Sequence, residues 1–175
     1  MTESIVLGGG CFWCTETVMK RLRGVRSVVP GYAGGSTQNP DYEQVSMGQT
    51  GHAEVIKVDF DPSQIGLETT LEVFFATHDP TSMNRQGADV GTQYRSIILY
   101  SSNDQKEKIS EVIERLRPDF DSPIVTEVKK LDKFYPAEEF HRNFYEKNED
   151  KPYCHLVINP KLAKLRAKFA DLLVK

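Results

Sequence analysis

The stretch from residue 8 to residue 16, Gly-Gly-Gly-Cys-Phe-Trp-Cys-Thr-Glu, constrains the fold more than any other part of the chain. A short apolar run, Ile5 to Leu7, precedes it, and after Cys11 the apolar residues fall at helical spacing. The glycines allow the backbone to turn sharply between these two patterns. The sequence therefore predicts a strand-to-helix junction, with Cys11 at the N-terminus of the helix.

This position predicts a reactive thiol at Cys11. The unpaired N–H groups and the dipole at a helix N-terminus favour an anion, so we expect the pKa of Cys11 to be lowered. Phe12 and Trp13, the latter the only tryptophan, follow directly and would form an apolar wall beside the sulfur. The sequence thus favours a nucleophile with an apolar binding site, with an inert buried thiol as the alternative.

Length and composition exclude several classes of protein. A chain of 175 residues predicts one domain, residues 1–175, with a substantial core. The net charge of −3 and the absence of a lysine-arginine run argue against nucleic-acid binding, and no apolar stretch approaches the roughly 20 residues that span a membrane. The N-terminus does not resemble a signal peptide. Three cysteines, an odd number, favour a reducing compartment, so we expect a cytoplasmic protein.

Alternating patterns along the chain predict an α+β fold. Strands are expected at 25–29, 52–60, 95–101 and 124–131, the first ending at Pro30 and the third lying centrally in the sheet. Helices are expected at 12–23, 67–78 and 137–147, around 109–116, and from Pro160 onward. These elements predict a two-layer α/β sandwich with a mixed or antiparallel sheet and helices on one face. The connection 79–94 has no period and is long for a compact domain, so we expect it to be functional.

The strand at 52–60 places an acidic side chain on an apolar face. Ile56, Val58 and Phe60 share one face by the two-residue period of a strand, and the same parity puts Glu54 on that face. Burial disfavours the charged form of a carboxyl, so we expect the pKa of Glu54 to be raised. The alternative is a frayed strand end from which Glu54 reaches water.

Two further chemistries compete with a thiol enzyme that uses Cys11 as its nucleophile. A zinc module would have the ligands Cys11, Cys14, Cys154 and His155, but the last two are adjacent, which suits tetrahedral coordination poorly. A thioredoxin-like oxidoreductase would use the Cys-x-x-Cys pair that opens the helix. That reading leaves the tyrosine-bearing loops without a role.

Six stretches, in order, resemble the A-type methionine sulfoxide reductases, the peptide-methionine (S)-S-oxide reductases. The resemblance covers about residues 5–155 and rests on Gly10-Cys11-Phe12-Trp13, Gly31-Tyr32-Ala33-Gly34-Gly35, Asn39-Pro40-Asp41-Tyr42, Thr50-Gly51-His52-Ala53-Glu54, His78-Asp79-Pro80 and Gly91-Thr92-Gln93-Tyr94-Arg95-Ser96. It implies a sandwich with a ferredoxin-like core. It also implies reduction of the S epimer of methionine sulfoxide, free or in oxidised proteins, without a cofactor or metal.

The resemblance assigns roles to the candidate catalytic residues. Cys11 attacks the sulfoxide sulfur and becomes a sulfenic acid as methionine departs. Glu54 is the general acid that protonates the sulfoxide oxygen. Tyr42 and Tyr94 hold that oxygen through their hydroxyl groups.

Other positions of the family pattern describe the substrate pocket. Phe12 and Trp13 match the pocket for the substrate methyl group, and Asp89 matches a carboxylate that holds a water or polar group there. Many members of the family carry histidine where this chain has Val90, so any support from that ring is missing. His52 and His78 lie in family motifs, where we expect them to brace loops, and we expect His141 and His155 to be surface or core residues.

A second thiol is expected to resolve the sulfenic acid by forming a disulfide, which thioredoxin then reduces. Cys154 matches a resolving position of the family, and we favour it over Cys14. Cys14 lies one helical turn from Cys11, where many members have glycine, so it remains the alternative. We expect the protein to act as a monomer.

Overall fold

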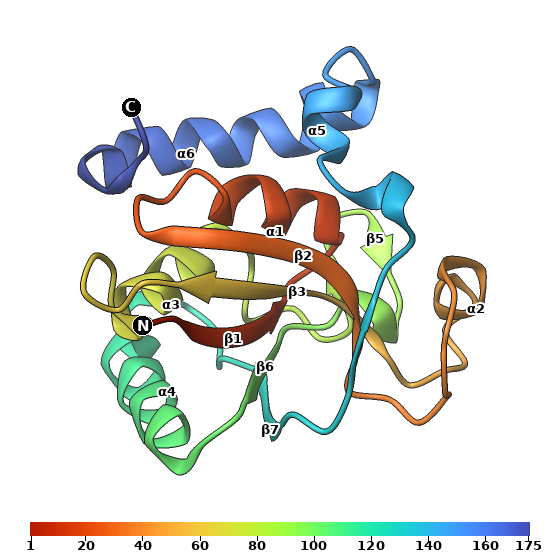
Figure 1. The fold of residues 1–175 in the computed structure, drawn as a ribbon, viewed down its shortest axis with the longest axis horizontal. Coiled ribbons are helices and arrows are strands. Elements are labelled where there is room, and N and C mark those ends of the chain that lie inside the picture. The colour runs from red at the N-terminus through yellow and green to blue at the C-terminus, as the bar shows by residue number, and fades with distance from the viewer.

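Six strands form one mixed sheet in the order β7-β6-β1-β3-β2-β8 in the computed structural model, which describes residues 1–175 (Figure 1). β6 and β7 are parallel, and all other neighbours are antiparallel. The strands of this sheet are β1 Glu3–Gly8, β2 Val25–Ala33, β3 Ala53–Phe60, β6 Ile97–Tyr100, β7 Glu127–Lys130 and β8 Phe134–Pro136. A separate two-stranded ribbon pairs β4 Arg85–Gln86 with β5 Asp89–Val90.

The helices are α1 Phe12–Met19, α2 Tyr42–Ser46, α3 Leu67–Ala76, α4 Asn103–Leu116, α5 Phe144–Lys147 and α6 Asn159–Phe169. Of these, α1, α3 and α4 pack on one face of the sheet. The units β1-α1-β2 and β3-α3-β6 give the strand order β6-β1-β3-β2 at the centre of the sheet. This is the ferredoxin-like core of a two-layer α/β sandwich, so the predicted fold is confirmed. β6 is interior, as expected, because it pairs with both β1 and β7.

The core lies between the sheet and its helices. Ile56, Val58 and Phe60 of β3 point into a cluster of 27 buried residues on the helix side, whereas Val55 belongs to a cluster of six on the other face. Most apolar burial, and with it most of the hydrophobic stabilisation, is therefore on the helix side. α6 packs on the outer side of α1, away from the sheet (Figure 1). None of the helices is both long enough and apolar enough to cross a membrane.

β2 does not end at Pro30, contrary to the prediction. It continues to Ala33, with Pro30 opposite Ile56 of β3. The N and O atoms of one strand residue point to the same side. The Pro30 carbonyl accepts a hydrogen bond from Ala137 N–H at 2.9 Å, so the missing N–H of Pro30 also faces this side. Pro30 therefore keeps its pairing with β3, and its missing N–H falls at the end of β8, where the ladder stops.

The helix predicted for 137–147 is wrong. The segment instead contains a 3₁₀ turn at Glu139–His141, a left-handed residue at Asn143 with φ 56°, and only the single helical turn α5. Phe140, Phe144 and Tyr145 have the spacing of one helix face, which predicts that they lie in the core, but Phe140 is 64% exposed. We call residues 134–158 the C-terminal strap; they run from β8 to a π-helical turn, Cys154–Ile158, that leads into α6.

Candidate active site

The glycine run between β1 and α1 sets the position of Cys11. A Cβ atom on Gly9 would lie 2.7 Å from the His78 ring, and Gly10 has φ +87°, so both positions favour glycine. Gly10 N–H donates to the Tyr94 carbonyl at 3.1 Å, which fixes the junction beside the turn that carries Tyr94. Cys11 is the N-cap of α1, as predicted.

The pKa of Cys11 is raised, not lowered as predicted. Burial is the main cause, because the side chain is only 7% exposed, and the Cys14 thiol and the Glu54 carboxyl raise the pKa further. The backbone hydrogen bond from Trp13 acts in the lowering direction but is the smaller effect. Desolvation therefore raises the pKa of Cys11 more than the helix N-terminus lowers it, and the resting nucleophile is a neutral thiol.

Glu54 of β3 lies buried beside this thiol. Its Oε1 accepts a hydrogen bond from Phe12 N–H at 3.1 Å, and Oε2 is buried with no hydrogen-bond partner in the protein. Burial raises the pKa of Glu54 to about 8, although the Phe12 N–H opposes the shift. The direction predicted from strand parity is confirmed. A protonated carboxyl at neutral pH can act as a general acid.

Tyr42 and Tyr94 reach the same region from separate loops. Tyr42 opens α2, whose N-terminus is held by a capping box between Asp41 and Gln44. Tyr94 ends the 3₁₀ turn Thr92–Tyr94. The pKa of each phenol is raised, chiefly by burial and next by the nearby Glu54 carboxyl. Both hydroxyl groups therefore stay protonated and can donate hydrogen bonds.

The strap covers the aromatic wall next to Cys11. The Phe144 ring stacks on Trp13 with a centroid separation of 3.7 Å and an interplanar angle of 5°, and Tyr153 meets Trp13 edge-on at 5.7 Å. Trp13 Nε1–H donates to His141 Nδ1 at 3.1 Å. Phe12 is fully buried behind Trp13, 5.0 Å from the His141 ring. His141 is thus a buried part of the site wall, and sequence reasoning missed this role.

Glu138, at the start of the strap, joins two tyrosines of the site. Its Oε2 accepts from Tyr42 N–H at 3.0 Å, and its Oε1 accepts from the Tyr32 hydroxyl at 2.9 Å. Sequence reasoning missed this residue too. Its partners lie 96 and 106 positions away, and no local pattern could have indicated them.

A second chain of polar contacts joins the strap to the loop 79–94. The Tyr153 hydroxyl lies 3.4 Å from Cys14 Sγ and donates to Asp89 Oδ2 at 3.1 Å. Asp89 lies on β5, and the neighbouring Val90, the position where the family often has histidine, is 66% exposed. Val90 has no polar group to offer Asp89, and the side-chain contact to Asp89 comes from the Tyr153 hydroxyl instead.

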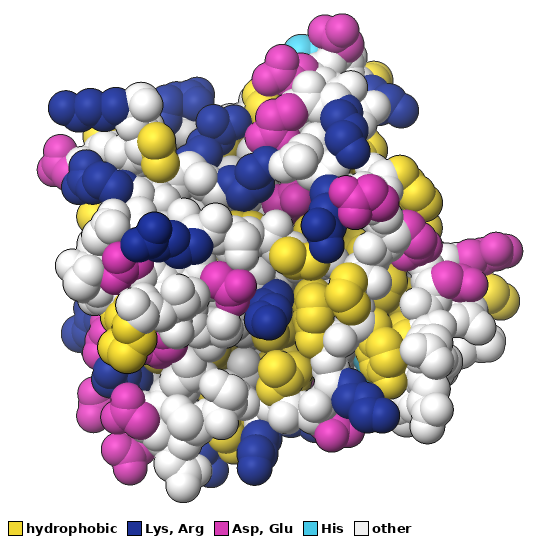
Figure 2. Space-filling model, viewed as in Figure 1, with side chains coloured by type: hydrophobic (Ala, Val, Ile, Leu, Met, Phe, Trp, Pro, Cys, Tyr) yellow, Lys and Arg dark blue, Asp and Glu magenta, His cyan; other side chains and the backbone are white.

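A cavity of about 290 Å³ reaches both thiols of the Cys-x-x-Cys pair. Of the predicted site residues, Cys11, Cys14 and Asp89 line it, whereas the acid, the two oxygen-holding tyrosines and the aromatic pair are not among its lining residues. Its walls come from the glycine junction, the ribbon β4–β5, and the start of the C-terminal helical region. The lining residues are Gly9, Gly10, Cys11, Cys14, Gln86, Gly87, Ala88, Asp89, Tyr153, Val157 and Lys161. On the face of the molecule seen in Figure 1, Figure 2 shows hydrophobic side chains gathered in the area between α5 and α2.

Cys154 and His155 do not join this cavity. Cys154 is fully buried in the π-helical turn, and burial raises the pKa of its thiol, with the Cys14 charge adding to the rise. His155 is exposed, with Nδ1 3.4 Å from Asn159 Nδ2. No group of three or more histidine, cysteine or carboxylate side chains converges to hold a metal ion, so the zinc hypothesis gains no support.

His52 and His78 brace loops, as expected. His52 Nδ1 accepts from Gly35 N–H at 3.0 Å, and Nε2 lies 2.7 Å from the Thr37 carbonyl. His78 lies between the Phe74 carbonyl and the Ser96 hydroxyl, at 2.6 and 2.7 Å. Burial lowers the pKa of His78 to about 4, so its ring is neutral.

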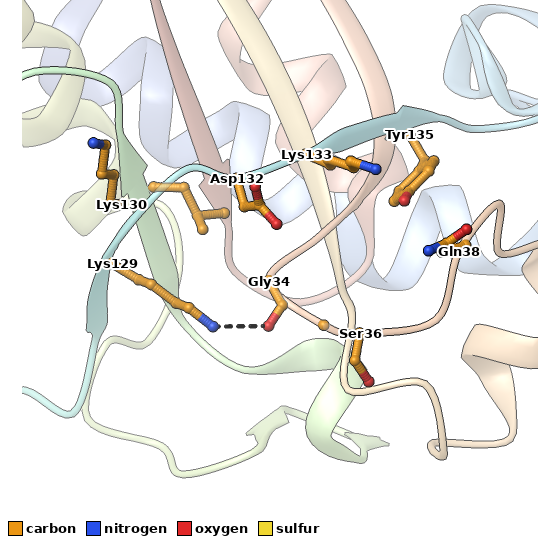
Figure 3. A pocket seen from close by; sticks show the side chains of 10 residues that line it. Gly34, Ser36, Gln38, Lys129, Lys130, Asp132, Lys133 and Tyr135 are labelled. Carbon is orange, nitrogen blue, oxygen red and sulfur yellow. Dashed lines mark hydrogen bonds between the residues drawn. The ribbon is translucent and has the colours of Figure 1, made fainter.

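A larger cleft of about 380 Å³ lies elsewhere, beside the small core on the other face of the sheet (Figure 3). It is bordered by Lys129, Lys130, Lys133 and the glycine loop at Gly34, and Lys129 Nζ donates to the Gly34 carbonyl at 3.3 Å. The cleft contains no thiol and no buried acid. The cavity at Cys11, although smaller, is therefore the candidate active site.

Comparison with known proteins identifies the family of this chain. The sequence pattern of the family described as "Peptide methionine sulfoxide reductase" matches residues 3–173. A peptide methionine sulfoxide reductase MsrA of Trichodesmium erythraeum is 55% identical over 173 residues, which cover 98% of each chain. The crystal structure of reduced Mxr1 from Saccharomyces cerevisiae has a TM-score of 0.81 at 33% identity, over 87% of this chain and 89% of that one.

A second yeast structure shows Mxr1 in complex with Trx2. It has a TM-score of 0.58 and 26% identity, over 79% of this chain and 82% of that one. The sequence match to the family extends over nearly the full length of the chain. The solved structures of related proteins share the fold described above. This chain belongs to the peptide methionine sulfoxide reductase family.

Proposed function

We propose that this protein reduces the S epimer of methionine sulfoxide, free or in oxidised proteins, with Cys11 as the nucleophile. The observation that carries the proposal is the pairing of Cys11 with Glu54, a buried carboxyl with a pKa of about 8 and a free Oε2. The whole chain, residues 1–175, acts as one catalytic domain. The family membership and the MsrA relatives support the same activity.

The first half of the reaction moves two electrons and one oxygen atom. Cys11 Sγ attacks the sulfoxide sulfur, Glu54 protonates its oxygen, and Tyr42 and Tyr94 hold that oxygen through their hydroxyl groups. The oxygen then passes to Cys11 as its thiol proton is lost, which leaves methionine and a Cys11 sulfenic acid. Methionine sulfur is reduced by two electrons and Cys11 sulfur is oxidised by two.

The aromatic wall and Asp89 complete the pocket. Trp13, backed by the fully buried Phe12, forms the apolar side that takes the substrate methyl group, and a methionine sulfur gains from contact with an aromatic ring. Asp89 orders a polar group at the opposite side, and the Tyr153 hydroxyl orients its carboxylate. In this scheme the strap holds Trp13 in place through Phe144 and His141.

A second thiol then resolves the sulfenic acid, and the geometry favours Cys14. The Cys14 side chain lines the same cavity as Cys11. The neighbouring Cys11 thiol is the main cause that lowers the pKa of Cys14. Cys154, the thiol that the family pattern favoured, is buried behind a π-helical turn and would need that turn to open.

Recycling by thioredoxin completes the cycle. The Mxr1–Trx2 complex shows such a partner on a related protein, and we extend it to this chain. Thioredoxin supplies two thiols, which reduce the Cys11 disulfide and leave thioredoxin oxidised. The three cysteines of this chain are all free, which suits a reducing compartment, and we propose that the protein works in the cytoplasm as a monomer.

A thioredoxin-coupled assay on the separated S and R sulfoxides tests the activity. We expect turnover of the S epimer alone and no turnover by Cys11→Ser. Equal reduction of both epimers, or substantial turnover by Cys11→Ser, would contradict the proposal. An exposed serine far from the site, Ser110→Ala, is the matched control and should retain full turnover.

Single-turnover experiments assign the resolving thiol. Without reductant, we expect Cys14→Ser to form one methionine per enzyme and to accumulate the sulfenic acid, which a dimedone-type reagent traps. Cys154→Ser should instead form a Cys11–Cys14 disulfide that mass spectrometry maps. The reverse pattern would make Cys154 the resolving thiol.

A further inference from the structure

Lys161 is a cation in the catalytic cavity to which no step above gives a chemical task. It is the third residue of α6 and lines the cavity that contains Cys11 and Cys14. Its Nζ donates to the Thr77 carbonyl at 2.8 Å, and no carboxylate lies within ion-pair distance of it. A half-buried ammonium group without a carboxylate partner is costly, and an anion that forms beside it would offset that cost.

The Thr77 carbonyl fixes the direction of this cation. Thr77 is the C-cap of α3, where the helix dipole presents its negative end. The hydrogen bond therefore anchors Nζ at the end of one helix while the stem of Lys161 comes from another. Lys161 therefore lies at the boundary between the Cys11 cavity and the neighbouring cleft that Thr77 and Lys164 line.

Several charged groups surround the two sulfur atoms and this ammonium group. Those that face Cys14 are Cys11, Glu54, Asp89, Tyr153, Cys154 and Lys161. Those that face Lys161 are His78, Asp79, Asp89, Lys164 and the Cys11 and Cys14 thiols. Every other group that faces Cys14 becomes negative when it ionises. Lys161 is therefore the one cation of this set that can stabilise a Cys14 thiolate.

We propose that Lys161 is a positioning residue that makes Cys14 the resolving thiol by holding a positive charge beside its thiolate. The inference rests on the proposed sulfoxide reduction. In the resolving step, the Cys14 thiolate attacks Cys11 Sγ and the S–O bond of the sulfenic acid breaks. The hydroxide that leaves takes up the proton that Cys14 had released, and one water molecule forms. Cys11 sulfur is reduced by one electron and Cys14 sulfur is oxidised by one, which gives the disulfide.

The same charge helps in recycling. When thioredoxin attacks Cys11 Sγ of the disulfide, Cys14 is the leaving group, and a thiol leaves faster as a stabilised thiolate. Loss of Lys161 should then slow both the formation and the reduction of the Cys11–Cys14 disulfide. It should slow them most at low pH, where Cys14 would be protonated.

The test is the pH dependence of disulfide formation in single-turnover experiments, followed by the loss of free thiols after a pulse of methionine S-sulfoxide. In Lys161→Met we expect the midpoint of the profile to move upward by about one pH unit relative to wild type. Lys161→Arg keeps the charge and should restore most of the profile. Lys164→Met removes an exposed cation from the same helix and should leave the midpoint in place.

Release of methionine in the same samples separates the two proposals. If wild type releases no methionine, the proposed function fails. If wild type releases one methionine and forms the Cys11–Cys14 disulfide, but Lys161→Met keeps the wild-type midpoint, the role of Lys161 is overturned. A Lys161→Met profile that Lys161→Arg does not restore would also overturn it, because that result indicates a loss of packing rather than of charge.

Discussion

The two halves of the site are built in different ways. The nucleophile and the acid lie on regular elements, Cys11 at the start of α1 and Glu54 on β3, and the hydrogen bond from Phe12 N–H to Glu54 Oε1 joins them directly. The strap that covers them is a series of short turns, in which no helix before α6 exceeds five residues. The regular core therefore fixes the positions of the reactive groups, whereas the strap shapes the pocket. The conformation of the strap does not follow from the conformation of the core.

Of the changes that test this comparison, loss of the acid Glu54 should have the largest effect, and that effect should be on activity. We expect Glu54→Gln to lower kcat/KM for methionine S-sulfoxide by about 10²–10⁴-fold, because the amide cannot protonate the departing oxygen. The size of the side chain is nearly unchanged, so the fold should be retained. Glu111→Gln, an exposed position on α4, should keep full activity. A loss below tenfold for Glu54→Gln would show that the acid is another group.

The same carboxyl should make stability depend on pH. The pKa of Glu54 is about 8 in the folded protein, above its ordinary value of 4.5, so between these values the folded state binds a proton that the unfolded state has lost. The free energy of unfolding therefore falls as pH rises through this window, by up to about 1.4 kcal/mol per pH unit. Below pH 4.5 both states are protonated, and the contribution is fully present.

Urea unfolding at several pH values between 5 and 8 checks this linkage. Glu54→Gln cannot ionise, so its stability should gain on that of wild type as pH rises. Parallel curves for the two proteins would mean that Glu54 is not desolvated in the folded state. The expected result would make Glu54 a residue that serves the reaction at a cost to stability near neutral pH.

The sequence predicts the positions of Cys11 and Glu54 better than it predicts the structure of the strap, and the reason is physical. Glu54 could be placed because residues 56–60 of β3 alternate between buried apolar and partly exposed polar side chains, and the two-residue period then fixes which face Glu54 shares. Cys11 could be placed because the glycine run marks a junction. Its pKa was predicted in the wrong direction because the helix N-terminus is a local feature, whereas burial depends on the whole fold.

The strap offers no such regularity. Turns of three or four residues have no period, and His141 meets Trp13 across 128 positions of sequence. The aromatic spacing at 140–145 resembled a helix, but the rings of Phe140 and Phe144 have different environments, one exposed and one stacked on Trp13. Their partners could be found only in the folded chain.

Those two phenylalanines allow a matched comparison within the strap. We expect Phe144→Ala to lower the free energy of unfolding by about 2 kcal/mol, because it removes a half-buried ring stacked on Trp13. Phe140→Ala should change it by less than about 0.5 kcal/mol, since that ring is 64% exposed. Trp13 is the only tryptophan, so its emission should shift to the red in Phe144→Ala alone. Equal effects at both positions would show that the strap does not rest on Trp13.

The smallest expected effect concerns the hydrogen bond from Trp13 to the strap. Burial lowers the pKa of His141, so its ring is neutral and Nδ1 can accept from the indole N–H at 3.1 Å. His141→Leu removes the acceptor and should cost about 1 kcal/mol of stability, with a higher KM for the sulfoxide as Trp13 loses its fixed orientation. His141→Gln offers an amide oxygen in place of Nδ1 and should recover part of both losses. If the two variants behave alike, the ring of His141 contributes packing only, and stacking on Phe144 is what holds the wall of the pocket.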